Sequence, residues 1–284
     1  MFKQKKRTIV VIRFLCLSLL ALIVLFPVLY TILYSFSSPE EVKNQYLLLK
    51  SSYVQRSFSL FPKQFSLQSY YEVFLATPNY LIKFWISLCL CSAIVVGQLL
   101  ISCLGGFAFA KYTFFGKRVY FFLLLILMLM PIQVTLLPNY IVLDKLHLLG
   151  SWWALCIPSI FSPFGAFFMT LIFQGIPNEI VESAELDGAS TLQILFGILV
   201  PTAKTGMISL AILTFIDSWN MVEQPMVFLE AIYQYPLSVF LASVLEQNAA
   251  LQFVCGILGL IPVTLLFGFF RDELIEGISI SGMK

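Results

Sequence analysis

Long apolar segments without charge constrain the fold of this chain more than any other feature. The stretch Phe84–Ala110 contains no Asp, Glu, Lys or Arg, and five further segments are nearly as apolar. A helix needs about 20 apolar residues to cross the hydrocarbon layer of a bilayer. The chain is 60% hydrophobic and only 11% charged, whereas soluble domains are about one quarter charged. It is therefore predicted to be an integral membrane protein.

The apolar segments predict an all-α protein with six transmembrane helices, since their continuous pattern lacks the alternation of a membrane β-barrel. The predicted spans are residues 9–36, Phe84–Ala110, Val119–Leu143, Trp152–Phe173, Pro201–Gln224 and Leu251–Phe270. Four prolines are expected to kink or break the third and fourth spans. They are Pro131, Pro138, Pro158 and Pro163.

The distribution of basic residues predicts the orientation. Six spans place both termini on one side, and 11 of the 17 Lys and Arg residues fall on that side. The short segments MFKQKKR and KYTFFGKR are among them. Because short cytoplasmic segments carry an excess of Lys and Arg, both termini are predicted to be cytoplasmic. Residues 1–8 and 273–284 are then cytoplasmic tails, and residues 37–80 form an extracytoplasmic loop.

A charged cytoplasmic loop at residues 178–201 interrupts the apolar pattern with four acids, Glu179, Glu182, Glu185 and Asp187. Asn178 is expected to cap a first helix, whose early acids favour the positive end of the helix dipole. Gly188 is expected to end that helix in the left-handed conformation. Val181, Ala184 and Gly188 share a face small enough for close approach by another chain.

A second short helix is predicted to follow, with Ser190 as its cap and Pro201 as the start of the fifth span. Its apolar residues share one face at helical spacing. They are Leu192, Leu195, Phe196 and Leu199. The alternative interpretation is a connector that only lies on the membrane surface, although such helices are usually basic.

Three polar residues share a face of the fifth span: Asp217, Asn220 and Gln224. They either line a path for a polar solute or are interior groups that neighbouring helices satisfy. Trp219 between them could equally be an interfacial anchor. The six cysteines lie in apolar segments and are expected to be small buried hydrophobic residues.

Three segments carry a resemblance to a known family. The charged loop is similar to the EAA loop of ABC importer permeases, with the pattern E-A-A, three residues, G, nine residues, I, one residue, L-P. The chain has Glu182-Ser183-Ala184, Gly188 and Ile198-Leu199-Val200-Pro201 at that spacing, and departs from it at Ser183 and Val200. The run Phe215-Ile216-Asp217-Ser218-Trp219-Asn220, followed by Pro225, is similar to the F-I-x-x-W-N-x-x-x-x-P pattern of carbohydrate-uptake permeases of the maltose-transporter type. The segment Arg271–Ser279 resembles the end of one subunit class, with a displaced glycine.

The resemblance implies an ABC type-1 importer transmembrane core over residues 81–272, which works with other subunits. Its expected partners are a second homologous permease subunit, an ABC ATPase dimer and an extracytoplasmic solute-binding protein. ATP and Mg²⁺ would be used by the ATPase, and no cofactor, metal or catalytic residue is expected in this chain. The residues expected to couple to the ATPase are Glu182, Ser183, Ala184, Asp187 and Gly188.

The resemblance also implies a path for a sugar along Asp217, Asn220 and Gln224. Tyr233, Tyr235 and Pro236 resemble a loop that reaches into the binding protein, although an ordinary loop is equally compatible with the sequence.

The chain contains no G-x-x-x-x-G-K-[ST] motif for ATP. A polyol-like cargo such as glycerol phosphate stays an alternative to a sugar.

A secondary transporter or channel would need ionisable residues deep in the spans, and Asp217 alone is a candidate. A membrane enzyme would need catalytic groups, and the single histidine, His147, lies in a short outer loop with Asp144 and Lys145.

Overall fold

The computed structural model describes residues 2–50, 59, 61–76, 79–247 and 249–275, and these residues are almost entirely helical. Within them, the β-type pairing is one isolated antiparallel bridge between Ser37 and Phe65. The predicted all-α class is confirmed. The chain divides into two units, which are described separately. Unit 1 comprises Met1–Leu81 and Leu241–Ile261, and unit 2 comprises Ile82–Phe240 and Pro262–Lys284.

Unit 1 contains the first apolar helix and the segment that follows it. Its complete helices are α1 (Phe2–Ser35), α2 (Pro39–Lys50), α3 (Gln68–Tyr71) and the π-helical turn η1 (Glu72–Ala76). Tyr34, at the end of α1, is buried and lies against Tyr30 and Phe253, with ring centroids 4.3 and 5.6 Å away. The Gln45 amide donates a hydrogen bond of 2.9 Å to the Tyr34 hydroxyl, so part of the polar segment after α1 is attached to that helix.

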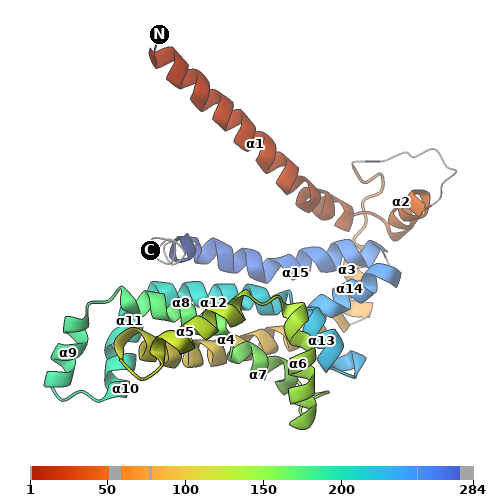
Figure 1. The fold of residues 1–284 in the computed structure, drawn as a ribbon. Helices are drawn as coiled ribbons and strands as arrows, with labels where there is room; N and C mark the ends of the chain where they lie inside the picture. Colours follow the sequence, from red (N-terminus) through yellow and green to blue (C-terminus); the bar gives the residue numbers. More distant parts are fainter. Residues whose placement is uncertain (1, 51–58, 60, 77–78, 248, 276–284) are drawn as a thin grey trace. The chain divides into compact units, whose positions relative to one another are not determined.

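Unit 2 contains the helices of the central part of the chain, which Figure 1 colours from yellow to cyan. They are α4 (Asn79–Lys111), α5 (Lys117–Leu129), α6 (Ile132–Lys145), α7 (Trp153–Ile160), α8 (Pro163–Gln174), α9 (Asn178–Leu186), α10 (Thr191–Ile194), η2 (Leu195–Leu199), α11 (Val200–Thr202), α12 (Lys204–Trp219), α13 (Glu223–Phe228) and η3 (Ile232–Gln234). Three helices include residues of both units: α4, whose first residues belong to unit 1, α14 (Leu237–Gln247) and α15 (Ala249–Phe269).

The apolar helices are compatible with six membrane spans. Within the described residues, four helices are long and apolar enough to cross a bilayer, and six spans result if each of two bent pairs counts as one. The first pair is α5 with α6, with a bend of 108° between the two helices. The second pair is Thr191–Thr202 with α12, with a bend of 82°. Pro131 precedes α6 and Pro163 begins α8, whereas Pro138 and Pro158 lie inside helices. The expected proline breaks therefore occur at two of the four positions.

The fifth predicted span does not form one continuous helix. It was expected to begin at Pro201 and end at Gln224, but α12 begins at Lys204 and ends at Trp219. Pro201 belongs to the short α11, and Ala203, with φ −89° and ψ 13°, leaves the helical conformation before α12 starts. The proline is tolerated because it lies in the first turn of its own short helix.

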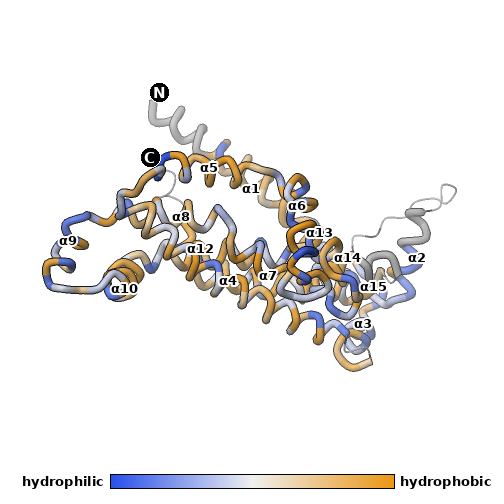
Figure 2. Tube along the Cα trace, turned by 60° about the horizontal axis from the view of Figure 1, so that its bottom comes forward, coloured by the Kyte–Doolittle hydropathy of each residue, from blue (hydrophilic) through white to orange (hydrophobic). Residues whose placement is uncertain are grey.

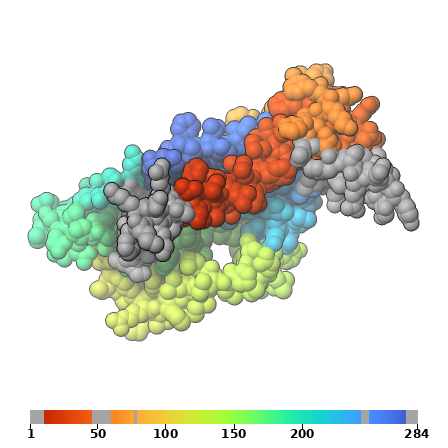
Figure 3. All heavy atoms as spheres, turned by 90° about the horizontal axis from the view of Figure 1, so that it is seen from above, coloured from red at the N-terminus to blue at the C-terminus, as the bar shows by residue number. Residues whose placement is uncertain are grey.

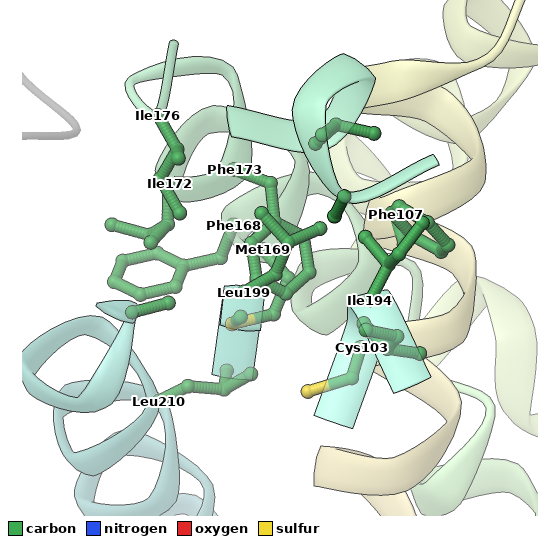
Figure 4. Packing of buried hydrophobic residues seen from close by; sticks show 14 residues of the cluster. Cys103, Phe107, Phe168, Met169, Ile172, Phe173, Ile176, Ile194, Leu199 and Leu210 are labelled. Atoms are coloured by element: carbon green, nitrogen blue, oxygen red, sulfur yellow. The ribbon is translucent and has the colours of Figure 1, made fainter. Parts of the chain in front are cut away.

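Helices α4 and α8 approach each other closely. A Cβ added at Gly106 would lie 2.6 Å from Met169 Cβ and 2.8 Å from its backbone carbon, so this contact requires a glycine. Around it lies a buried apolar cluster that includes Phe168 and Phe173 of α8 and Cys103 and Phe107 of α4 (Figure 4). Ile194 and Leu199, from the segment after α9, belong to the same cluster.

The cysteines differ in part from the expectation. Four are buried, but Cys16 and Cys89 are exposed on the surface of their helices. An apolar sequence context does not distinguish a side chain that faces the bundle from one that faces lipid.

Candidate functional site

The charged loop forms a separate element at one end of unit 2. Figure 1 shows α9 and α10 beyond the ends of α8 and α12, and the hydropathy colours show α9 as a mostly hydrophilic segment beside apolar helices (Figure 2). In the space-filling view, the green residues around α9 form one end of the unit (Figure 3). A polar helix in this position is accessible from outside the bundle.

Helix α9 has a packed face and a free face. Val181 and Ala184 are buried in the cluster that includes Phe173 and Leu195. The expectation that they offer a close-approach surface to another chain is therefore wrong, because this face packs within the chain itself. The exposed residues of α9 and its end include Glu182, Ser183, Glu185, Leu186 and Asp187, and Leu186 is 90% exposed.

The end of α9 is a Schellman turn around Gly188. This glycine has φ +80°, as the sequence predicts. Its N–H donates to the Glu185 carbonyl and the N–H of Ala189 donates to the Ala184 carbonyl, both at 3.0 Å. These two bonds satisfy carbonyls that would otherwise lack partners at the helix end. A Cβ added at Gly188 would meet no heavy atom of the described residues within 4 Å, so the need for glycine comes from the backbone.

The second short helix begins at the predicted cap but buries a different face. Gln193 Oε1 accepts hydrogen bonds from the N–H and hydroxyl of Ser190, at 2.8 and 2.9 Å. Leu195 and Leu199 are buried as expected, whereas Leu192 and Phe196 are exposed. The π-helical turn η2 (Leu195–Leu199) adds a residue to the turn, so side chains predicted to share a face separate.

Lys111 fixes the start of α9, a role that the sequence did not reveal. Its Nζ, at the end of α4, donates to the Ile176 carbonyl and, at 2.9 Å, to Asn178 Oδ1. Asn178 was expected to cap α9, but the helix has no side-chain cap hydrogen bond. The asparagine bonds a residue distant in the sequence instead of the neighbouring backbone.

A partly open cavity of about 660 Å³, with several polar side chains in a mostly apolar wall, lies in unit 2 between residues of α4, α5, α6, α7, α8, α12 and α13. Protein sites for small molecules are typically 300–1,000 Å³. Gln98, Thr214 and Ser218 line it and are almost fully buried, and Asp217 and Gln224 line it too. The structure therefore brings together two of the three predicted path residues. Gln98, which the sequence analysis missed, is the one amide in the span Phe84–Ala110.

The F-I-x-x-W-N segment divides into packing residues and cavity residues. Phe215 stacks on Trp219, with ring centroids 5.4 Å apart, and the Asn220 amide donates to the Ile216 carbonyl at 2.8 Å. Asn220 does not line the cavity.

Asp217 and Ser218 are the two positions that the pattern leaves open between Ile216 and Trp219, and both line the cavity. Trp219 is buried, so its interpretation as an interfacial anchor is wrong.

The outer turn before α14 is held from two sides. The buried Lys83 donates hydrogen bonds of 2.8 Å to the carbonyls of Ile232 and Tyr233, and Gln234 Nε2 donates to the Gly150 carbonyl at 2.8 Å. Tyr233 is 74% exposed. Of the other two residues predicted to contact a binding protein, Tyr235 is half-buried and Pro236 is buried.

The C-terminal segment contacts α12 before the described residues end. The Ser209 hydroxyl donates to the Glu273 carbonyl at 2.6 Å, and Leu274 is buried. The later part of the predicted tail motif, Gly277–Ser279, lies outside the described residues.

His147 is exposed, with φ +55°, and its N–H donates to the Asp144 carbonyl at the end of α6. No group of three possible metal ligands occurs among the described residues.

Comparisons with known proteins agree with this architecture. The family model described as "Binding-protein-dependent transport system inner membrane component" matches residues 7–278. The arabinooligosaccharides transport system permease protein AraQ of Halalkalibacterium halodurans is 30% identical, over 93% of both chains. Protein LplC of Bacillus subtilis is 26% identical, over 92% of this chain and 90% of LplC.

Two further matches extend the comparison. The sn-glycerol-3-phosphate transport system permease protein UgpE of Yersinia pestis is 31% identical over 128 residues, which cover 45% of this chain and 46% of UgpE. A crystal structure of a bacterial ABC transporter involved in the import of the acidic polysaccharide alginate superimposes with a TM-score of 0.79. The aligned region is 23% identical and covers 94% of this chain and 97% of that one, which shows the common fold. The chain belongs to the family of binding-protein-dependent transport system inner membrane components, and it is a transport permease subunit, not an enzyme.

Proposed function

We propose that this permease subunit carries a sugar or oligosaccharide across the bacterial cell membrane after a solute-binding protein has delivered it. The observation that carries the proposal is the group of polar side chains that line the cavity of an otherwise apolar unit. Its carboxylate, amides and hydroxyls can exchange hydrogen bonds with sugar hydroxyls. The relative AraQ, which matches over nearly the whole chain, is named for arabinooligosaccharides, and this supports the choice of cargo.

The cavity residues have distinct parts in this proposal. Asp217 and Gln224 contact the passing sugar, together with Gln98 and Ser218, because all four line the cavity. Asn220 stays a predicted path residue, although its amide is bonded to the Ile216 carbonyl. A second homologous permease subunit completes the path.

The charged loop is proposed to couple transport to ATP hydrolysis. Glu182, Ser183 and Asp187 are exposed beside Leu186, which gives α9 an acidic surface around an apolar side chain suited to a groove on an ATPase dimer. Ala184 supports this surface from its packed inner face, and Gly188 sets the turn. ATP and Mg²⁺ bind the ATPase subunits, and this chain supplies no cofactor.

The extracytoplasmic side, opposite the charged loop, is proposed to receive the binding protein. Tyr233 stands out from a turn that Lys83 and Gln234 hold in place, so it can contact a partner without losing order. Tyr235 and Pro236 support the turn from within. This arrangement requires both termini to be cytoplasmic, as the Lys and Arg distribution predicts.

Reconstitution of the whole transporter tests the proposal. The permease, the partner permease, the ATPase and the binding protein encoded beside it would be assembled in proteoliposomes and assayed with radiolabelled oligosaccharides. ATP-dependent uptake of at least one sugar, abolished by omission of the binding protein, is the expected result. Uptake without ATP would indicate a secondary transporter or channel, and uptake of glycerol phosphate alone would overturn the assignment of a sugar cargo.

A further inference from the structure

The cavity has a marked charge asymmetry. Asp217 is the only charged residue among those that line it, and no Lys, Arg or His contributes to its wall within the described part of the chain. The neighbouring acid Glu223 does not line the cavity, and its carboxylate is already engaged, because it accepts hydrogen bonds of 2.9 and 3.1 Å from Gln133 Nε2. This half of the path therefore offers an anion no positive partner.

The Asp217 carboxylate is also unengaged. It has no hydrogen-bond or ion-pair partner among the described residues, and Asp217 is an exposed residue that lines the cavity. Ionisable residues within membrane-spanning helices are costly and usually serve a function. A free carboxylate accepts strong, charge-assisted hydrogen bonds from hydroxyl groups and repels another carboxylate or a phosphate.

The remaining polar groups suit uncharged cargo. Gln98, Thr214 and Ser218 are each at least 94% buried and line the same cavity. Amides and hydroxyls both donate and accept hydrogen bonds, and they do not neutralise an anion. Aromatic side chains, such as those of Phe161 and Phe228, complete the wall.

We infer that Asp217 makes this subunit selective for uncharged sugars and hinders cargo that carries a carboxylate or phosphate group. The inference rests on the proposed sugar transport and narrows its substrate class. This charge preference would distinguish the chain from an importer of glycerol phosphate. It would also distinguish the chain from an importer of acidic polysaccharide, although the chain shares its fold with such a protein.

A matched pair of cargoes tests the inference in the complete transporter. One is a neutral oligosaccharide that the wild type imports, and the other is its aldonate, obtained by oxidation of the reducing end. Maximal uptake rates are measured in proteoliposomes with the same saturating binding protein for the wild type, Asp217→Asn and Glu223→Gln. Because the binding protein is constant, its own preference cancels when the variants' acidic-to-neutral rate ratios are compared.

Asp217→Asn is expected to raise the acidic-to-neutral ratio about tenfold, since it removes the repulsion between like charges at close range. Glu223→Gln removes one negative charge from α13, outside the cavity wall, and is expected to leave the ratio unchanged. An unchanged ratio in Asp217→Asn, or an equal rise in Glu223→Gln, would overturn the inference. Absence of ATP-dependent uptake of any sugar by the wild type would instead refute the proposed function.

Discussion

Gly188 shows how a single backbone position can set the end of the charged loop. Its φ of +80° is accessible to glycine, whereas a residue with a Cβ pays about 1–2 kcal/mol there. No atom of the described residues lies within 4 Å of an added Cβ, so a substitution acts through backbone strain and through any partner that binds the loop.

Gly188→Val is therefore expected to leave the permease inserted in the membrane but to reduce both ATPase association and uptake. Valine is stiff and strongly disfavours positive φ. Gly188→Asn is the control, because asparagine tolerates the left-handed conformation. Co-purification of the ATPase with each variant, beside an uptake assay, gives the measurement. Full uptake with Gly188→Val would show that the loop is only a connector.

Leu186 and Leu195 provide a second contrast, between an exposed and a buried leucine in the same loop. Leu186 is 90% exposed, whereas Leu195 is fully buried. Leu186→Ser is expected to weaken ATPase co-purification at unchanged thermal stability of the purified permease. Leu195→Ala is expected to cost about 2–5 kcal/mol of stability through lost packing. If Leu186→Ser lowered thermal stability as much as Leu195→Ala, its side chain would be a packing residue instead of a docking residue.

Local chemistry explains which residues the sequence could predict. Gly188 and Ser190 act on backbone groups within a few residues of themselves, so their roles follow from spacing. Asn178 was assigned a local role, but Lys111 engages its side chain from another helix. Leu192 and Phe196 were misplaced because the π-helical turn η2 changes the helical period, and the apolar pattern carries no signal for it.

At the scale of the helices, α4 connects the two parts of the candidate site. Gln98 lines the cavity, and Lys111, at the end of the same helix, holds the start of α9 through Ile176 and Asn178. Gly106, between them, packs directly on α8. A rigid helix with both contacts can transmit a displacement of the charged loop to the cavity.

Lys111→Met is expected to lower sugar uptake more than ATP hydrolysis, because it removes the polar contact with α9 and retains most of the aliphatic stem. Lys111→Arg retains a cationic donor and is expected to recover at least part of the uptake. The measurement is the ratio of sugar imported to ATP hydrolysed in proteoliposomes. Equal loss of both activities in the two variants, with poor assembly, would indicate a purely structural contact.

The helices themselves were predictable where hydrocarbon thickness sets their length. The uncharged segment Phe84–Ala110 indicated most of α4, and the bend near Pro131 and the interruption before Pro163 follow from the missing N–H of proline. The polar residues 37–50 were treated as loop, yet α2 (Pro39–Lys50) forms there. The cavity was visible only as Asp217 and Gln224, because its other walls come from helices far away in the sequence.

At the scale of the whole molecule, fold and family follow from features spread along the entire chain, whereas the cargo depends on a few side chains. The family model matches residues 7–278, and the open motif positions Asp217 and Ser218 face the cavity. A subunit of this kind can keep the residues that build α12 and change those that meet the solute. Similarity of fold to an alginate importer is therefore compatible with a different charge preference here.

The orientation of the molecule in the membrane gives the last prediction. Both α9 and the turn at Tyr233 carry exposed residues, and the Lys and Arg distribution places them on opposite sides of the bilayer. Ser183→Cys and Tyr233→Cys would be made in a background without the exposed Cys16 and Cys89. A membrane-impermeant maleimide is expected to label Tyr233→Cys in spheroplasts and Ser183→Cys only after permeabilisation. Labelling of Ser183→Cys from outside would show that the orientation is the opposite of the predicted one. The acidic face of α9 could not then contact an ATPase in the cytoplasm.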